Sequence, residues 1–173
     1  MTRCDLSLGF VGLGALGLPM AINLHRAGFP LRVHTRSRSA ETSAGLEGAI
    51  RCSSPADAST GVDVLLLCVS DDAAVEDVLF GPNGAASQLS DGSVVLDCST
   101  IAPATAQRCG ERLAGQNVHY LDAPVTGGTE GAKRGSLTVL VGGASELLER
   151  VKPILEVIGG CLLYTSPSPR DTM

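Results

Sequence analysis

Residues 12–17 read Gly-Leu-Gly-Ala-Leu-Gly, the G-x-G-x-x-G spacing of a phosphate-binding turn. The turn follows an apolar run of strand length and opens a segment with helical spacing, as a dinucleotide-binding turn requires. Gly12 would permit the tight turn, Gly14 would let the backbone approach a pyrophosphate, and Gly17 would let the helix pack closely on the strand. We therefore predict that a dinucleotide binds at Gly12, Leu13, Gly14, Ala15, Leu16 and Gly17. The alternative is that these glycines serve only a tight turn.

The residues that would meet the adenosine end of the dinucleotide are basic and hydroxylated. In folds that select NAD, an acidic residue about 20 positions further on binds both ribose hydroxyls. This chain instead has Thr35, Arg36, Ser37 and Arg38 at that place, and no carboxylate. Two guanidinium groups suit a 2′-phosphate, because arginine donates charge-assisted hydrogen bonds to phosphate and stacks on adenine. We predict NADP rather than NAD as the cofactor, bound by Thr35, Arg36 and Ser37, with a solvated basic loop as the alternative.

Apolar runs of strand length alternate with segments of helical spacing along almost the whole chain, which is typical of an α/β protein. The most hydrophobic run, residues 62–69, predicts a central strand buried on both faces. The other expected strands are residues 6–11, 30–35, 49–52, 93–98, 117–121 and 137–141. The expected helices are residues 16–28, 37–46, 55–60, 71–79, 103–114 and 145–158, with a glycine-rich loop before the last strand. We predict a Rossmann-type, doubly wound, mostly parallel sheet.

The composition indicates which kinds of molecule the chain can bind. The 173 residues include 13 Lys and Arg against 18 Asp and Glu, for a formal net charge of -5. This length suits one domain whose core needs no disulfide or metal. The acidic balance argues against nucleic acid, and the longest apolar stretch is too broken by glycine for a bilayer span. The same balance predicts a small-molecule ligand, and the lack of a signal-peptide cleavage pattern near the start predicts a cytoplasmic protein. The six cysteines show no C-x-x-C spacing, which predicts reduced thiols and no metal site.

The isolated histidines and a pair of carboxylates have structural explanations. His25, His34 and His119 have no nucleophile or metal-ligand partner at a meaningful spacing, so we expect structural roles for them. Asp71 and Asp72 follow the central strand at the edge where ligands bind in such sheets. Capping of the next helix explains these carboxylates equally well, so we assign them no catalytic role.

The last residues differ in character from the rest of the chain. From Cys161 the sequence reads Cys-Leu-Leu-Tyr-Thr-Ser-Pro-Ser-Pro-Arg-Asp, which resembles the translation of a transposon-type sequencing adapter. We therefore expect a native domain over residues 1–160 and adapter read-through over residues 161–173. The alternative is a genuine flexible tail rich in serine and proline.

Three motifs in order resemble those of one enzyme family. Residues 10–24, Phe-Val-Gly-Leu-Gly-Ala-Leu-Gly-Leu-Pro-Met-Ala-Ile-Asn-Leu, resemble the N-terminal signature of the β-hydroxyacid dehydrogenases, with Leu16 in place of the usual Met. Residues 97–100 resemble the family's D-x-S-T, and residues 122–128, Asp-Ala-Pro-Val-Thr-Gly-Gly, its D-A-P-V-S-G-G. The resemblance covers about Leu6 to Gly160. The family includes 3-hydroxyisobutyrate dehydrogenases and 2-hydroxy-3-oxopropionate reductases.

The resemblance implies a reversible NAD(P)-dependent oxidation of a β-hydroxy acid to its semialdehyde. It implies that Thr126, Gly127 and Gly128 hold the substrate carboxylate, a role that suits an anion-binding glycine turn. A plain loop is the alternative for this segment. The resemblance also implies that Val69, Ser70 and Thr100 lie at the cofactor.

The family's general acid/base is a lysine on a second, all-helical domain, with an asparagine four residues later. Only Lys133 and Lys152 occur here, and neither has that context. The resemblance therefore implies that the catalytic lysine lies beyond residue 160, that this fragment lacks the helical domain and is inactive, and that the full-length protein is a homo-oligomer. An imine reductase-like N-terminal domain and a non-catalytic dinucleotide-binding module remain as alternatives.

Overall fold

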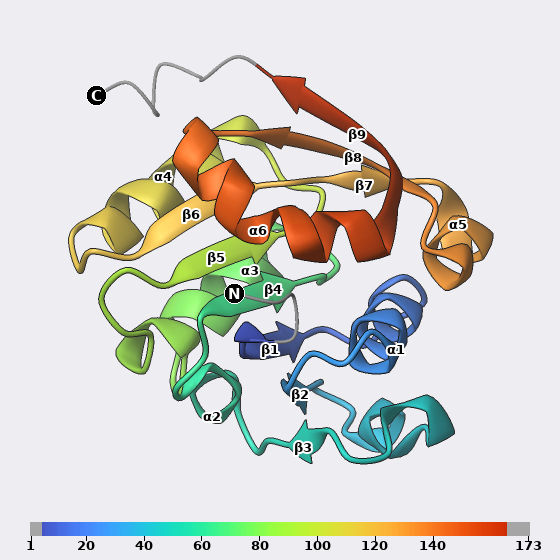
Figure 1. Cartoon of the computed structure of the whole chain (residues 1–173). Coiled ribbons are helices and arrows are strands. Elements are labelled where there is room, and N and C mark those ends of the chain that lie inside the picture. The colour runs from blue at the N-terminus through green and yellow to red at the C-terminus, as the bar shows by residue number, and fades with distance from the viewer. Residues whose placement is uncertain (1–4, 166–173) are drawn as a thin grey trace.

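The computed structural model describes residues 5–165 and contains a six-stranded parallel sheet of order β3-β2-β1-β4-β5-β6 (Figure 1). The strands are β1 Leu8–Val11, β2 Leu31–His34, β3 Ile50–Arg51, β4 Val64–Leu67, β5 Val94–Asp97 and β6 His119–Asp122. This is the strand order of a dinucleotide-binding Rossmann sheet. The predicted fold is therefore confirmed.

Helices cover both faces of the sheet, each over its own hydrophobic core. The α-helices are α1 Gly17–Arg26, α2 Pro55–Ser59, α3 Asp72–Phe80, α4 Pro103–Ala114, α5 Gly128–Arg134 and α6 Ser145–Ile158. Buried side chains of α1, α5 and α6 form one core with β1, and those of α2, α3 and α4 form the other. Strand β4 contributes alternate residues to the two cores, Leu66 to one and Leu65 to the other, as its uninterrupted apolar run predicts. No helix within residues 5–165 combines the length and apolarity needed to cross a bilayer.

A second, three-stranded sheet packs beside the first. Its strands are β7 Val125–Thr126, β8 Leu137–Gly142 and β9 Gly159–Thr165, with β7 antiparallel and β9 parallel to β8. Residues 161–165, which we set apart from the native domain, thus form part of β9, where Leu162 pairs with Val139 and packs against the core. Residues 166–173 lie outside the described part of the chain.

Two expected segments differ in the structure. The helix expected over residues 37–46 is replaced by two 3-10 helices, η2 Ser39–Thr42 and η3 Ala44–Leu46. Arg38 precedes η2 with a φ of 65°, a left-handed conformation that a right-handed helix cannot include. The glycine-rich loop expected before β8 instead contains α5, whose end is tied to α1 because Asn23 Nδ2 donates to the Ala132 carbonyl at 2.9 Å.

Asp71 caps α3, and its removal should weaken the domain. Its carboxylate accepts a hydrogen bond from the Ala74 N–H at 2.8 Å. We expect Asp71→Ala to lower the free energy of unfolding by about 1 kcal/mol, the usual cost of losing an N-cap. Urea unfolding measures this, with Asp91→Ala in an exposed turn as the control, expected to change stability by less than about 0.5 kcal/mol. Equal effects of the two substitutions would contradict the capping role.

Candidate functional site: a dinucleotide pocket

A cavity of about 430 Å³ lies where β1, β2 and β4 end. The chain leaves β1 through α1 on one face of the sheet and leaves β4 through α3 on the other, so this edge is the topological switch point where ligands bind in such folds. Seven residues that were predicted to bind the cofactor line it: Gly12, Leu13, Gly14, Thr35, Arg36, Val69 and Ser70. The structure therefore brings the glycine turn and the basic residues after β2 into one pocket.

The other five predicted cofactor residues do not line this cavity. Ala15, Leu16 and Gly17 lead into α1, and a Cβ at Gly17 would collide with the Gly12 carbonyl oxygen, as its predicted packing role requires. Ser37 is exposed and contacts Ser39, and Thr100 is exposed after β5. Sequence reasoning missed further lining residues, namely Val11, His34, Ser53, Pro55, Cys68, Ala74, Asp77, Val78 and Pro82. These come from α3 and the turn after it, the start of α2 and the ends of neighbouring strands, and local sequence carries no signal for them.

The glycine turn is fixed by its neighbours. Gly12 has a φ of 104°, and a Cβ there would collide with the carbonyl oxygen of Cys68, the residue directly after β4. The Leu13 N–H donates to Thr35 Oγ1 at 3.3 Å, which joins the turn to the end of β2. A Cβ at Gly14 would meet nothing within 4 Å, so this side of the turn is open to a ligand. At the start of α1 the Leu18 and Met20 N–H groups donate to the Gly14 and Leu16 carbonyls, and Pro19 has no N–H. Phosphate oxygens would therefore be bound by backbone N–H groups of the turn itself.

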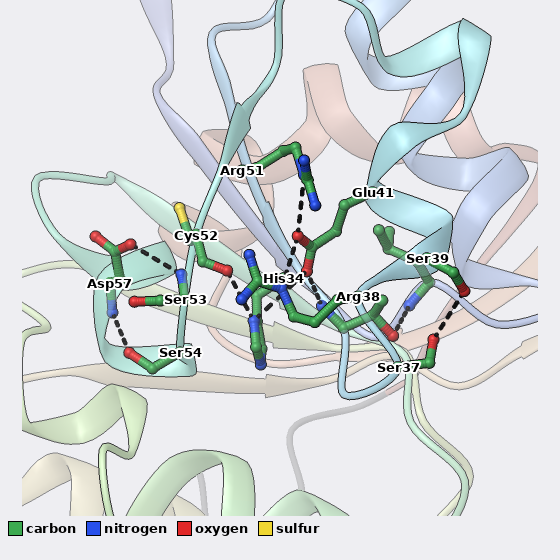
Figure 2. A network of polar contacts seen from close by, with 12 residues as sticks. His34, Ser37, Arg38, Ser39, Glu41, Arg51, Cys52, Ser53, Ser54 and Asp57 are labelled. Carbon is green, nitrogen blue, oxygen red and sulfur yellow. Dashed lines mark hydrogen bonds and ion pairs between the residues drawn. The ribbon is translucent and has the colours of Figure 1, made fainter.

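Basic side chains surround the end of β2 (Figure 2). Arg36 is exposed, lines the cavity and makes no ion pair within the described residues. Arg38 also lines the cavity, and its Nε donates to both carboxylate oxygens of Glu41 at 2.9 and 3.0 Å. His34 Nδ1 lies 2.9 Å from the Cys52 carbonyl oxygen, which can only accept, so Nδ1 carries the proton in that contact. The site therefore offers an unpaired guanidinium group for an anion.

A chain of hydrogen bonds through the buried Asp97 supports the β4 side of the pocket. Asp97 is fully buried at the end of β5, where Tyr120 Oη donates to its Oδ2 at 2.6 Å and the Ser99 N–H to its Oδ1 at 3.0 Å. Ser99 Oγ in turn accepts from the Val69 N–H at 2.9 Å. Val69 lines the pocket. Residues 97–100, which resemble D-x-S-T, therefore position Val69 through the hydrogen bond from its N–H to Ser99.

The buried carboxyl of Asp97 should make the free energy of unfolding depend on pH. Burial raises the pKa of Asp97 above its usual 3.8, so the folded protein holds the proton more tightly than the unfolded chain does. The stability from this group is therefore fully present below the usual pKa and is lost as the pH rises through the raised value. We expect Asp97→Asn, which cannot ionise, to remove this decline. Urea unfolding of both proteins from about pH 4 to pH 7 measures the effect, and parallel pH profiles would contradict it.

A family model of the NAD-binding domain of 6-phosphogluconate dehydrogenase matches residues 7–166. The chain belongs to this family. It is an NAD-binding domain, and the match runs six residues past the domain boundary that we expected at residue 160.

Relatives of this NAD-binding domain confirm the resemblance to β-hydroxyacid dehydrogenases. The 2-hydroxy-3-oxopropionate reductase of Escherichia coli is 40% identical over 154 residues, which are 89% of this chain and 52% of the reductase. The crystal structure of 3-hydroxyisobutyrate dehydrogenase from Salmonella typhimurium is 33% identical, with a TM-score of 0.89 over 96% of this chain and 58% of that one. An imine reductase from Pseudomonas sp. shares the fold, with a TM-score of 0.82 at 24% identity, over 96% of this chain and 57% of the reductase. The chain spans about half the length of the curated relatives it matches.

The segment expected to hold a substrate carboxylate lies outside the dinucleotide pocket. Thr126 ends β7, and Gly127 and Gly128 start α5; all three are exposed. The two glycines have φ values of 134° and 65°, which glycine adopts most readily. The segment therefore joins β7 to α5, and its binding of a substrate carboxylate stays a prediction.

The surroundings of Cys68, Lys133 and Lys152 indicate structural rather than catalytic roles for these side chains. Cys68 lines the pocket, but burial raises its pKa to about 11, so the thiol stays protonated near neutral pH. Lys133 on α5 is exposed and pairs with Glu130, and Lys152 is exposed on α6. Within residues 5–165 no three His, Cys, Asp or Glu side chains are grouped as metal ligands would be.

Proposed function

We propose that this domain binds NADP in preference to NAD. The observation that carries the proposal is the single cavity that contains both the glycine turn and two arginines, Arg36 and Arg38. The turn would hold the pyrophosphate, while the guanidinium groups would bind the 2′-phosphate. Thr35 and Ser37 would add hydroxyl donors, and Val69, Ser70 and Thr100 would flank the rest of the cofactor.

We propose that the complete protein interconverts a β-hydroxy acid, similar to 3-hydroxyisobutyrate or glycerate, and its semialdehyde. The names of the relatives support this reaction class. The cofactor supplies the hydride chemistry, and the protein positions the reactants. Thr126 would donate its hydroxyl to the substrate carboxylate, and the backbone N–H groups at Gly127 and Gly128 would complete an anion-binding turn.

We propose that the proton-transfer group is a lysine beyond residue 160, on an all-helical domain. Lys133 and Lys152 lie on α5 and α6 and do not line the dinucleotide pocket. A missing general acid/base removes a contribution of about 10² to 10⁴ in rate, so the 173-residue chain should bind cofactor without appreciable turnover. The complete protein would act as a homo-oligomer in the cytoplasm, where the free buried thiols Cys52, Cys98 and Cys109 stay reduced.

Assays of the gene product extended at its C-terminus test this reaction. We expect NADP reduction with 3-hydroxyisobutyrate or glycerate, and no such activity from the 173-residue chain. Reduction of a cyclic imine without semialdehyde reduction would favour an imine reductase. Binding of NADP by an extended protein with neither activity would favour a non-catalytic dinucleotide-binding module. Semialdehyde reduction by the chain alone would contradict the proposed source of the proton-transfer group.

We propose that residues 161–173 are adapter read-through rather than native sequence. The resemblance of residues 161–171 to a translated adapter supports this origin, whereas the formation of β9 requires only that Leu162 and its neighbours can pair with β8. Independent long reads across the locus test it. A different sequence after residue 160 is expected; the same tail followed by a stop codon would contradict the proposal.

A further inference from the structure

Glu41 is a buried carboxylate that contacts Arg38, one of the basic residues that line the dinucleotide pocket. Its side chain is completely buried, on η2. Arg38, Arg51 and His34 lie around its two oxygens (Figure 2). Three N–H groups donate to these oxygens: the Thr35 N–H at 2.9 Å, Arg38 Nε at 2.9 Å and Arg51 Nε at 3.4 Å. His34 Nδ1 lies 3.6 Å from Glu41 Oε2, and its hydrogen is donated to the Cys52 carbonyl. A carboxylate is costly to bury unless it is paired and hydrogen-bonded, and here both conditions are met. Arg36 and Arg38 line the pocket, whereas Glu41 does not.

Glu41 holds Arg38 by one edge only. The Arg38 Nε–H is shared between the two carboxylate oxygens, and neither terminal nitrogen of Arg38 has a hydrogen-bond partner within residues 5–165. A guanidinium group has five N–H donors in a planar fork, so fixing Nε leaves the terminal pair available for bidentate contact with a phosphate. The ion pair therefore orients Arg38 without consuming the donors that a phosphate would use.

The same carboxylate also orders the chain around the pocket. It accepts from the Thr35 N–H, and Thr35 Oγ1 accepts from the Leu13 N–H of the glycine turn at 3.3 Å. Glu41 is thus connected through one residue to the pyrophosphate end of the site. Removal of Glu41 would leave Arg38 and Arg51 without their shared counter-ion and would release the side chain of Arg38.

We propose that Glu41 is a positioning residue for 2′-phosphate recognition, which holds the Arg38 guanidinium group ready for the phosphate of NADP. The proposal rests on the proposed NADP preference and names a further determinant of it. The competing role for Glu41 would be that of the acidic residue that binds ribose hydroxyls in NAD-selecting folds. Against that role, its oxygens are occupied by protein donors and its side chain has no exposed surface.

Titrations of NADPH and NADH against the chain and its Glu41→Gln variant test the proposal. The substitution turns one acceptor oxygen into an NH₂ group, so it breaks at least one of the bonds to Thr35 and Arg38. It also removes a negative charge, which by itself would strengthen phosphate binding, so we titrate at about 0.5 M salt, where that effect is screened. We expect the variant to bind NADPH about three- to tenfold more weakly, because Arg38 must then be ordered on binding, and to bind NADH within about twofold of the original.

Two controls make the result specific. Glu76→Gln removes the same charge from an exposed ion pair with Arg108 and should leave both affinities unchanged. In an Arg38→Ala background, Glu41→Gln should lower NADPH affinity no more than it lowers NADH affinity, within about twofold. Unfolding curves show whether each variant is folded.

The outcomes separate the two proposals. If the original chain binds NADPH no better than NADH, the proposed NADP preference and the role of Glu41 are both wrong. If the original chain prefers NADPH and the Glu41→Gln variant keeps the full preference, or loses NADH binding instead, only the role of Glu41 is wrong.

A measurement on the unmodified chain covers the case in which Glu41→Gln fails to fold. The ¹⁵N-NMR signal of the Arg38 Nε–H, assigned from its loss in Arg38→Lys, should stay protected from exchange when 2′,5′-ADP binds. Loss of that protection would show that Arg38 Nε leaves Glu41 when the phosphate binds and would overturn the proposal.

Discussion

Gly14→Ala should leave the domain folded and lower its affinity for NADPH and NADH alike by about tenfold or more, equivalent to at least about 1.4 kcal/mol. A Cβ at this position meets nothing within 4 Å, so the folded protein accommodates it. The added methyl group would occupy the space through which the pyrophosphate approaches the backbone. Fluorescence titration measures the affinity, and urea unfolding checks that stability is kept.

Gly12→Ala is the matched comparison, because it changes the same turn at a position with no space. Its φ of 104° and the collision with the Cys68 carbonyl predict a loss of stability of about 2 to 6 kcal/mol, from backbone strain and overpacking together. If Gly14→Ala bound both cofactors as the original chain does, the turn would not hold the phosphates. A stable Gly12→Ala variant would contradict the packing of the turn against β4.

Arg36→Ala should weaken NADPH binding by about 10- to 100-fold, which corresponds to the loss of a hydrogen-bonded charge worth about 1.5 to 3 kcal/mol. NADH has no 2′-phosphate, so its affinity should change by less than about threefold. The reason is that Arg36 lines the pocket and has no competing ion pair within the described residues. Titration of both dinucleotides at one salt concentration gives the two ratios.

The control for Arg36→Ala is Arg26→Ala, which removes the same charge from the exposed last turn of α1. Both affinities should be retained in this variant. An equal loss of NADPH affinity in the two variants would indicate a general effect of net charge. An equal loss of NADPH and NADH in Arg36→Ala would place Arg36 away from the 2′-phosphate.

The main sheet and the glycine turn could be predicted because their signals are local. Strand β4 is buried on both faces, so residues 62–69 form one uninterrupted apolar run. The helix α5 could not be predicted, because its glycines disfavour a helix and its support comes from Asn23 on α1, more than a hundred positions earlier. The left-handed Arg38 likewise breaks a segment whose composition suits a helix.

Only part of the pocket could be predicted, because only some of its residues follow from local spacing. Spacing along the chain identifies Gly12 and Arg36, which follow successive strands. The partners of Glu41 and Asp97 depend on tertiary contacts, since Arg51 lies on the next strand and Tyr120 is 23 residues from Asp97. A carboxylate that is buried only through such contacts leaves no periodic pattern in the sequence.

A side-by-side titration of NADPH and NADH with the unmodified chain decides whether this is an NADP-binding domain. We expect NADPH to bind at least about tenfold more tightly, as one phosphate–arginine contact warrants, and 2′,5′-ADP to displace it. Equal affinities for the two dinucleotides would contradict the assignment of NADP, and failure to bind either one would contradict the pocket itself.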